Sequence, residues 1–242
     1  MRLVAAIIGL MAMFGGNLLS GVALAQDLPS AVPSPVPLPR ARPPAPPVWA
    51  QPLSFREAAG QDFDSAAVTS EPSACRKRLD LIAATSPMPR LIGPGTCGGT
   101  DMVEIDAVLM PNKERIALRP APVLRCELAE QLSTWVIGEA HPRITKAGMA
   151  LKSVTIADDY DCRGRNRVRG AKMSEHGMGN AVDLYGFVLA DKRVIKLTDK
   201  TVPKELRAGL RESACARFTT VLGPGSDGYH EEHIHFDLAA RR

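Results

Sequence analysis

Two segments of the chain carry residues whose types and spacing are suited to binding a metal ion. Residues 174–183 read Ser-Glu-His-Gly-Met-Gly-Asn-Ala-Val-Asp, and residues 230–235 read His-Glu-Glu-His-Ile-His. Four of the five histidines of the chain lie in these segments. Two imidazoles and one carboxylate would fill three positions around a metal ion and leave the fourth to water. That arrangement is typical of catalytic zinc sites rather than of closed structural ones.

The second segment places two histidines two residues apart. Side chains alternate between the two faces of a strand, so His233 and His235 should point to the same face. One imidazole could then bind the metal while the other faces a substrate beside it.

The two segments together resemble a superfamily of zinc peptidases. Their pattern, S-x-H-x-x-G-x-A-x-D followed by H-x-x-H-x-H, is similar to that of D-alanyl-D-alanine carboxypeptidases, murein endopeptidases and the hedgehog signalling domain. The region from Cys75 onwards also resembles the bacterial extensin-like C-terminal domain family. The resemblance implies the zinc-peptidase fold of that superfamily. It also implies one Zn²⁺ held by His176, Asp183 and His235.

Three further residues receive catalytic roles from the resemblance. Carboxypeptidase relatives have a glutamate base at the spacing of Glu232 from the last histidine, and endopeptidase relatives carry a catalytic histidine at the place of His233. Arg163 matches in part an arginine that carboxypeptidases hold over the substrate. The alternatives are a solvated acid for Glu232 and a surface arginine in a basic loop for Arg163.

Three more residues could support the site without reacting. Ser174 should hydrogen-bond within its own loop and so hold that loop in place. His230 has three open roles, which are support of a ligand, contact with a substrate and plain exposure. Asp237 should share a strand face with His235, so it either orients that imidazole or is a surface acid.

Length and composition limit the class of protein. The chain has 242 residues, 45% of them hydrophobic, which allows one ordinary domain with a real core. The formal net charge of +4 suits an anionic wall polymer as a partner. A nucleic-acid-binding protein would have a basic cluster interleaved with aromatic residues. Aromatic residues make up only 5% of the sequence and no such cluster is present, so we expect no nucleic-acid partner.

The first 72 residues are expected to lie outside the domain, which should span residues 73–242. Residues 1–25 have the positive start, apolar stretch and Ala-Leu-Ala end of a cleaved secretory signal peptide, and the alternative is an uncleaved membrane anchor. Residues 26–53 hold ten of the 20 prolines and should form an extended spacer or a ligand for a partner. Residues 54–72 should be an irregular linker. Cleavage would place the protein in the periplasm or outside the cell, with no stable membrane insertion.

Periodicity predicts an α+β domain in which a small, mostly antiparallel sheet with flanking helices carries the site. The expected helices are a short one capped by Ser73, one over residues 127–140, and one that starts near Pro203. The expected strands are a hairpin on either side of residues 111–114, one at Val154 and Ile156, and three over residues 181–187, 194–197 and 233–238.

The five cysteines are widely spaced and lie behind the expected signal peptide, which favours disulfides. We expect the pairs Cys75–Cys97 and Cys162–Cys215, which leaves Cys126 free. Because five is an odd number, at least one thiol is unpaired or pairs between chains.

The sequence thus predicts an exported, zinc-dependent peptidoglycan hydrolase that cuts amide bonds of stem peptides or cross-links containing D-amino acids. The H-x-x-H-x-H form favours an endopeptidase over a carboxypeptidase. One alternative is a non-catalytic, zinc-bearing module that binds the cell wall or a protein partner. Glu232 and His233 argue against that module, because a site that only binds needs no base. Another alternative is a wall-adhering structural protein whose proline-rich segment is the working part.

The expected cleavage site gives a first test. The exported protein should begin near Gln26, because Ala25 ends a small-x-small cleavage sequence. Sequencing of the N-terminus of exported protein measures this directly, and an intact Met1 would contradict the prediction.

Overall fold

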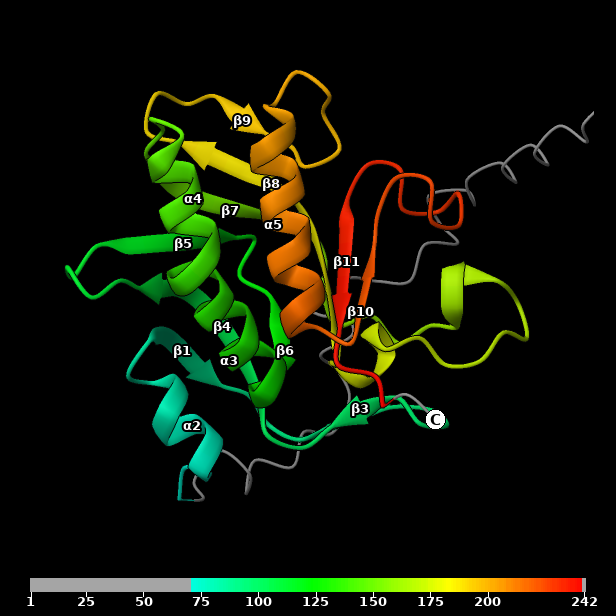
Figure 1. Cartoon of the computed structure of the whole chain (residues 1–242). Coiled ribbons are helices and arrows are strands. Elements are labelled where there is room, and N and C mark those ends of the chain that lie inside the picture. Colours follow the sequence, from blue (N-terminus) through cyan, green and yellow to red (C-terminus); the bar gives the residue numbers. More distant parts are fainter. Residues whose placement is uncertain (1–70, 241–242) are drawn as a thin grey trace, which may run out of the picture. The chain divides into compact units, whose positions relative to one another are not determined.

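The structure, a computed structural model, describes residues 71–240 and contains a nine-stranded, mostly antiparallel sheet (Figure 1). The strands of this sheet are β1 (Ala83–Pro87), β4 (Met102–Leu109), β5 (Arg115–Arg119), β6 (Val123–Arg125), β7 (Leu151–Asp158), β8 (Ala181–Leu189), β9 (Val194–Ile195), β10 (Thr220–Leu222) and β11 (Ile234–Asp237). Their order is β1-β4-β5-β7-β8-β11-β10, while β6 pairs with β4 and β9 with β8. Of the strand pairs described, only β5 and β7 run parallel. The predicted mixed class with a mostly antiparallel sheet is confirmed.

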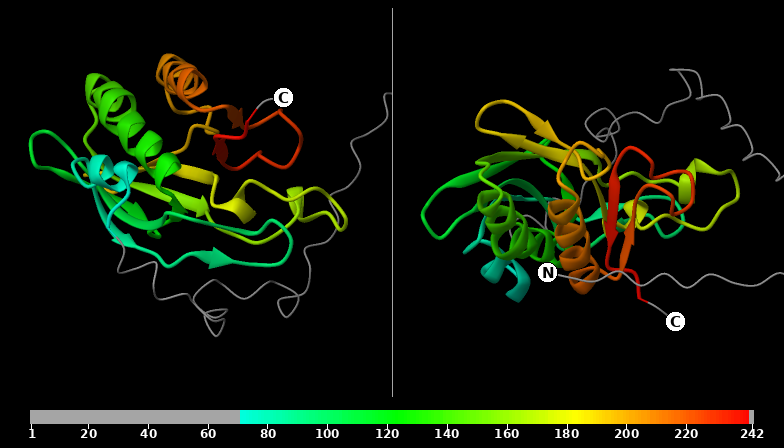
Figure 2. Two further views of the ribbon diagram at one scale, coloured as in Figure 1. Left: turned by 90° about the horizontal axis from the view of Figure 1, so that it is seen from below. Right: turned by 45° about the horizontal axis from the view of Figure 1, so that its top comes forward.

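Helices cover one side of this sheet, as Figure 2 shows for α3, α4 and α5. The helices are α2 (Ala74–Leu79), α3 (Cys126–Trp135), the π-helical turn η3 (Val136–Ala140), α4 (His141–Lys146), the single turns η4 (Arg165–Arg167) and η5 (His176–Met178), and α5 (Lys204–Arg217). A separate hairpin joins β2 (Leu91–Ile92) to β3 (Gly98–Gly99). No helix in residues 71–240 is long and apolar enough to cross a membrane. The predicted signal peptide, the proline-rich segment and residues 54–70 lie outside the described residues.

The helices form where capping and periodicity predict them. Ser73 caps α2, because its hydroxyl accepts a hydrogen bond from the backbone N–H of Arg76 at 3.0 Å. Leu206, Leu210 and Ala214 recur every four residues of α5 and are buried, which turns one face of that helix to the core.

The second predicted helix is longer than expected. It continues beyond Ala140, where η3 ends, into α4, although Pro142 has no N–H to extend an α-helical ladder. The backbone N–H of His141 bonds to the carbonyl of Val136, five residues earlier, so the helix widens by one π-helical turn where the proline enters.

An aromatic cluster fastens the helices to the strands that carry the site. The ring of Trp135 on α3 lies 5.3 Å from that of Phe236 on β11 and 6.2 Å from that of Phe187 on β8. Phe218, which follows α5, stacks on Phe236 at 4.6 Å. Since neighbouring residues of a strand point to opposite faces, burial of Phe236 among these rings turns His235 to the other face.

A bulge in β8 allows that strand to serve both the core and the site. Thr155 and Ile156 of β7 are consecutive but pair with Gly186 and Leu184, so β8 has one extra residue between them. Before the bulge Leu184 faces the core, and after it Phe187 does. The core-facing residues of β8 therefore have even numbers before the bulge and odd numbers after it.

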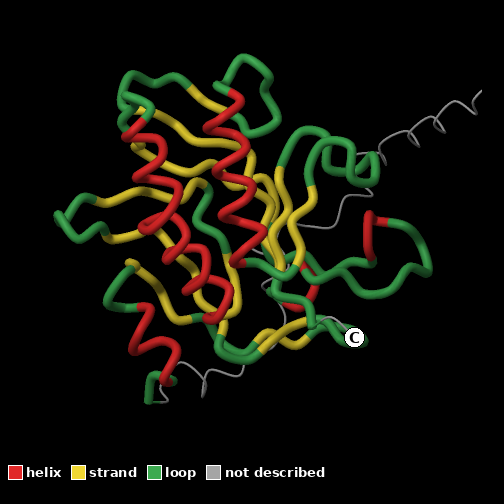
Figure 3. The backbone as a smooth tube through the Cα atoms, viewed as in Figure 1, coloured by secondary structure: helices red, strands yellow, loops and turns green. Residues whose placement is uncertain are grey.

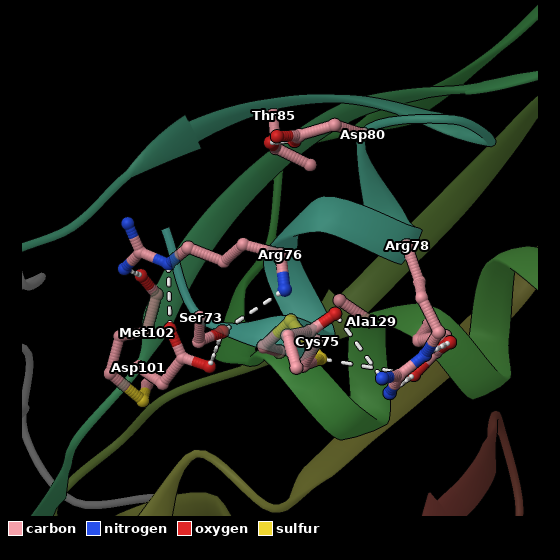
Figure 4. Close-up of a disulfide and its surroundings, with 12 residues drawn as sticks. Ser73, Cys75, Arg76, Arg78, Asp80, Thr85, Asp101, Met102 and Ala129 are labelled. Carbon is pink, nitrogen blue, oxygen red and sulfur yellow. Dashed lines mark hydrogen bonds and ion pairs between the residues drawn. A yellow bond between two sulfur atoms is a disulfide. The ribbon is translucent and has the colours of Figure 1, made fainter. Parts of the chain in front are cut away.

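The disulfides differ from the predicted pairing, which is wrong. Cys75 bonds to Cys126 and Cys97 bonds to Cys162, while Cys215 is free and exposed. Packing of α2 against the start of α3 brings the first pair to a Cα–Cα distance of 6.1 Å (Figure 4). Spacing along the chain gave no information on these contacts.

The observed pairing predicts a large loss of stability from one double substitution. The Cys75–Cys126 disulfide spans 51 residues, and the entropy of closing such a loop corresponds to about 4 kcal/mol of unfolding free energy. Cys75→Ala/Cys126→Ala should therefore unfold at much lower denaturant concentration than the wild type.

Cys215→Ser is the matched control and should change the unfolding free energy by less than about 0.5 kcal/mol, because this thiol is unpaired and exposed. Denaturant titration measures both variants. Peptide mapping without reduction that found Cys215 in a cross-link would contradict the pairing.

Candidate metal centre

His176, Asp183 and His235 converge on one buried point. His176 begins η5, Asp183 lies on β8, and His235 lies directly opposite Asp183 on the neighbouring strand β11. His176 Nε2 and His235 Nδ1 lie 3.3 and 2.9 Å from Asp183 Oδ1, and 3.2 Å from each other. Each of the three residues is at most 6% exposed.

The dimensions of this triangle suit a small divalent cation. Ligand atoms at 2.0–2.1 Å from a tetrahedral zinc ion lie about 3.3 Å from one another. The three separations in the triangle are 2.9–3.3 Å. Two nitrogens and one carboxylate oxygen are also donors that zinc accepts, so the residues fit the ion.

Hydrogen bonds to neighbouring oxygens leave one nitrogen of each imidazole for a cation. His176 Nδ1 donates to the carbonyl oxygen of Asp159 at 2.7 Å, which leaves its Nε2 bare. His235 Nε2 donates to the carboxylate of Asp237 at 3.0 Å, which leaves its Nδ1 bare. Such partners fix the tautomer and orientation of metal-binding histidines. The three atoms of the triangle are therefore all acceptors, and a proton or a metal ion must lie among them.

The protonation of the cluster reflects this need for positive charge. Burial alone would raise the pKa of Asp183, but hydrogen bonds with His176, His233 and His235 hold it far below its usual range. Burial alone would lower the pKa of His235, but hydrogen bonds with Asp183 and Asp237 raise it to about 9. Without a metal ion, His235 is thus protonated at neutral pH, and a bound cation would take the place of that proton.

The tight turn before β8 sets the position of His176. The hydroxyl of Ser174 accepts from the backbone N–H of His176 at 3.4 Å. Gly179 has φ +63°, and a Cβ there would lie 2.3 Å from the side chain of Met102. The positive φ and this close contact favour glycine at position 179 of the turn.

His233 and His230 lie on the other side of Asp183. His233 Nε2 is 3.1 Å from Asp183 Oδ2. The ring of His230 lies 5.1 Å from that of His233 and 5.3 Å from that of His235. The structure therefore brings four of the five histidines together around one carboxylate.

Glu232 and Arg163 do not enter this cluster. The side chain of Glu232 is 76% exposed, and its carboxylate lies 3.8 Å from Lys196 Nζ. The guanidinium of Arg163 is paired with Asp158 at 2.7 Å and with Asp161 at 2.9 Å. Arg163 is still near the site, because the backbone N–H of Asp161 donates to the carbonyl of His176.

Sequence reasoning missed three supports of the cluster. Asp159 provides the carbonyl that orients His176, and its carboxylate accepts from the backbone N–H of Val123 at 2.7 Å. Asp227 accepts from His230 Nδ1 at 2.7 Å. The Cys97–Cys162 disulfide packs beside the turn, since a Cβ on Gly177 would be 3.4 Å from Cys97 Sγ. An aspartate three residues before a histidine was the only signal for Asp227.

Another group of possible ligands, formed by Cys75, Asp101 and Cys126, offers no thiolate. The two sulfurs are bonded to each other. Asp101 instead accepts from Ser73 at 2.6 Å and from Arg76 Nε at 2.7 Å, which ties α2 to the start of β4 (Figure 4).

Comparison with models of known protein families identifies the family of the chain's second part. The family model for the extensin-like protein C-terminus matches residues 73–242. A comparison with curated proteins finds no match.

The protonation of His235 predicts how metal affinity depends on pH. Because the cation must displace a proton whose pKa is about 9, affinity for the first equivalent of zinc should rise about tenfold per pH unit between pH 7 and 8.5. Competition with a chromophoric chelator at several pH values measures this. An affinity that stops rising near pH 7, as ordinary imidazoles with a pKa of about 6.5 would give, would contradict the assignment.

Proposed function

The chain belongs to the extensin-like protein C-terminus family, and we propose that it is an exported, zinc-dependent peptidoglycan hydrolase. Its substrates are amide bonds of stem peptides or cross-links that contain D-amino acids. The observation that carries the proposal is the triangle of bare acceptors on His176, Asp183 and His235, with the half-buried imidazole of His233 beside it. The resemblance of the two histidine segments to zinc peptidases supports both the zinc-peptidase fold and the substrate class.

The residues divide into ligands, orienting groups and a proton carrier. Zinc, when bound, lowers the pKa of a coordinated water towards about 7 and polarises a carbonyl oxygen. His176, Asp183 and His235 hold the ion, and the Asp159 carbonyl and the Asp237 carboxylate orient the two imidazoles. The imidazole of His233 takes a proton from the attacking water and returns it to the leaving amine.

His233 is favoured over Glu232 as the proton carrier on geometric grounds. A general base must lie within hydrogen-bond reach of the proton it takes, directly or through one water. His233 Nε2 is 3.1 Å from a ligand carboxylate, whereas the Glu232 carboxylate is exposed and beside Lys196.

An endopeptidase fits better than a carboxypeptidase. A carboxypeptidase has to recognise the terminal carboxylate of its substrate, and Arg163 was the candidate for that contact. Its guanidinium is engaged by Asp158 and Asp161, and Arg167 shares the same two carboxylates. A substrate carboxylate would have to compete with both, whereas an internal amide bond makes no such demand.

Export is consistent with the cysteines. The Cys75–Cys126 and Cys97–Cys162 disulfides indicate folding in an oxidising environment. That environment agrees with the periplasmic or secreted location that the signal sequence predicts.

The second candidate function is a zinc-bearing module that binds the cell wall or a partner without cutting it. The outward position of Glu232 favours this candidate, because the expected carboxylate base is absent from the cluster. Wild-type protein that holds zinc but releases nothing from any wall fragment would select it.

Substitution of the two candidate bases separates these possibilities. With one equivalent of zinc bound, His233→Ala should digest peptidoglycan about 10²–10⁴-fold more slowly, which is the usual contribution of a general base. Glu232→Gln is the matched control and should change the rate little, because its side chain is largely exposed.

Both rates should be measured on samples whose zinc content is determined. A loss in Glu232→Gln as large as in His233→Ala would assign the base to Glu232 instead. Full activity in both variants, with zinc bound, would mean that neither is the base.

A further inference from the structure

Asp183 presents one carboxylate oxygen to a pair of histidines and the other to a third histidine. Oδ1 faces His176 and His235, which form the centre described above. Oδ2 faces His233, whose Nε2 lies 3.1 Å away. Ligand atoms of Asp183, His230 and His233 lie within 4.8 Å of one another, so they form a second group with the same donor types as the first.

His230 is oriented in the same way as the ligands of the first centre. Its Nδ1 donates to Asp227 Oδ1 at 2.7 Å, which leaves Nε2 bare. Asp227 is held in turn, because its carboxylate accepts from the backbone N–H of Tyr229 at 3.0 Å. A carboxylate that fixes the far nitrogen of an imidazole is typical of metal-binding histidines. The pair Asp227 and His230 thus repeats the arrangement of Asp237 and His235.

The burial of His230 and the partial exposure of His233 also suit a cation-binding site. His230 is only 7% exposed, yet it lies outside the proposed catalytic triangle. The side chain of His233 is 22% exposed, so this side of the cluster is open to solvent. Both histidines belong to the segment that leads from β10 to β11, drawn as a loop in Figure 3.

We propose that Asp183, His230 and His233 form a second divalent-cation site, which shares the carboxylate of Asp183 with the first. Two imidazoles and one carboxylate suit Zn²⁺. The second site should be the weaker one, because Asp183 already gives charge to the first ion and the two cations repel each other.

The inference rests on the proposed function only in that both sites use Asp183. Occupation of the second site would also regulate the proposed hydrolysis. An imidazole that binds a cation has no lone pair with which to accept a proton. A second zinc ion would therefore withdraw His233 from proton transfer, and zinc above one equivalent would slow hydrolysis.

Counting metal ions tests the proposal without any assay of activity. The metal-free full chain is titrated with Zn²⁺, and bound equivalents are determined by calorimetry and native mass spectrometry. The wild type should bind two equivalents in two steps. His230→Ala should lose the weaker step alone, and His176→Ala should lose the tighter one.

A milder variant guards against loss of folding. Asp227→Asn keeps the shape of the side chain and should weaken only the second step, by about 10–100-fold, as loss of an orienting carboxylate does. His141→Ala removes the one histidine outside the cluster, on α4, and should keep both steps.

Different failures have different meanings. A single equivalent in the wild type, lost in His176→Ala and kept in His230→Ala, would overturn the second site and leave the proposed function intact. A single equivalent lost in His230→Ala and kept in His176→Ala would support the site proposed here and overturn the catalytic centre. Two equivalents in His230→Ala, or an unchanged second step in Asp227→Asn, would overturn the second site.

Discussion

The carboxylate of Asp183 is the group on which the rest of the site depends. It is buried, and nitrogens of His176 and His235 face its Oδ1 while His233 lies at its Oδ2. A buried carboxylate without compensating positive charge is strongly unfavourable. The low pKa of Asp183 and the raised pKa of His235 are two expressions of this constraint. The cluster holds a proton when it is metal-free, and a divalent cation would satisfy the same acceptors.

The fold meets this constraint through the register of two strands. Antiparallel pairing of β8 with β11 sets His235 directly opposite Asp183. A slip of one residue would turn His235 towards the core and Phe236 towards the site. Contacts of Phe236 with Trp135 and Phe218 oppose such a slip. The aromatic core beneath the helices therefore stabilises the geometry of the site on the opposite face.

Much of this arrangement could be predicted from the sequence, because periodicity and motif spacing are local signals. The helix face around Leu206 and Leu210 and the strand with His235 follow from such patterns. The grouping of His176, Asp183 and His235 came from a resemblance between motifs, and the structure brings these three side chains together. The prediction of the disulfide pairs was wrong, because the pairing depends on the packing of α2 on α3 and of two distant loops.

The direction of single side chains was the least predictable feature. Glu232 has the spacing of a base, but the backbone before β11 turns it to Lys196 and turns His233 to Asp183. Asp227 and the carbonyl of Asp159 act through hydrogen bonds across loops, for which a sequence has no period. The continuation of the helix into α4 was hidden by Pro142, because proline usually marks the end of a helix.

The most direct test of the central claim is digestion of purified peptidoglycan by the full chain loaded with one equivalent of zinc, with the products identified by mass. The proposed function predicts new free amino groups at amide bonds involving D-amino acids. It also predicts that a chelator stops their release and that added zinc restores it. Products that form equally well in the presence of the chelator, or a zinc-loaded protein that releases none, would contradict it.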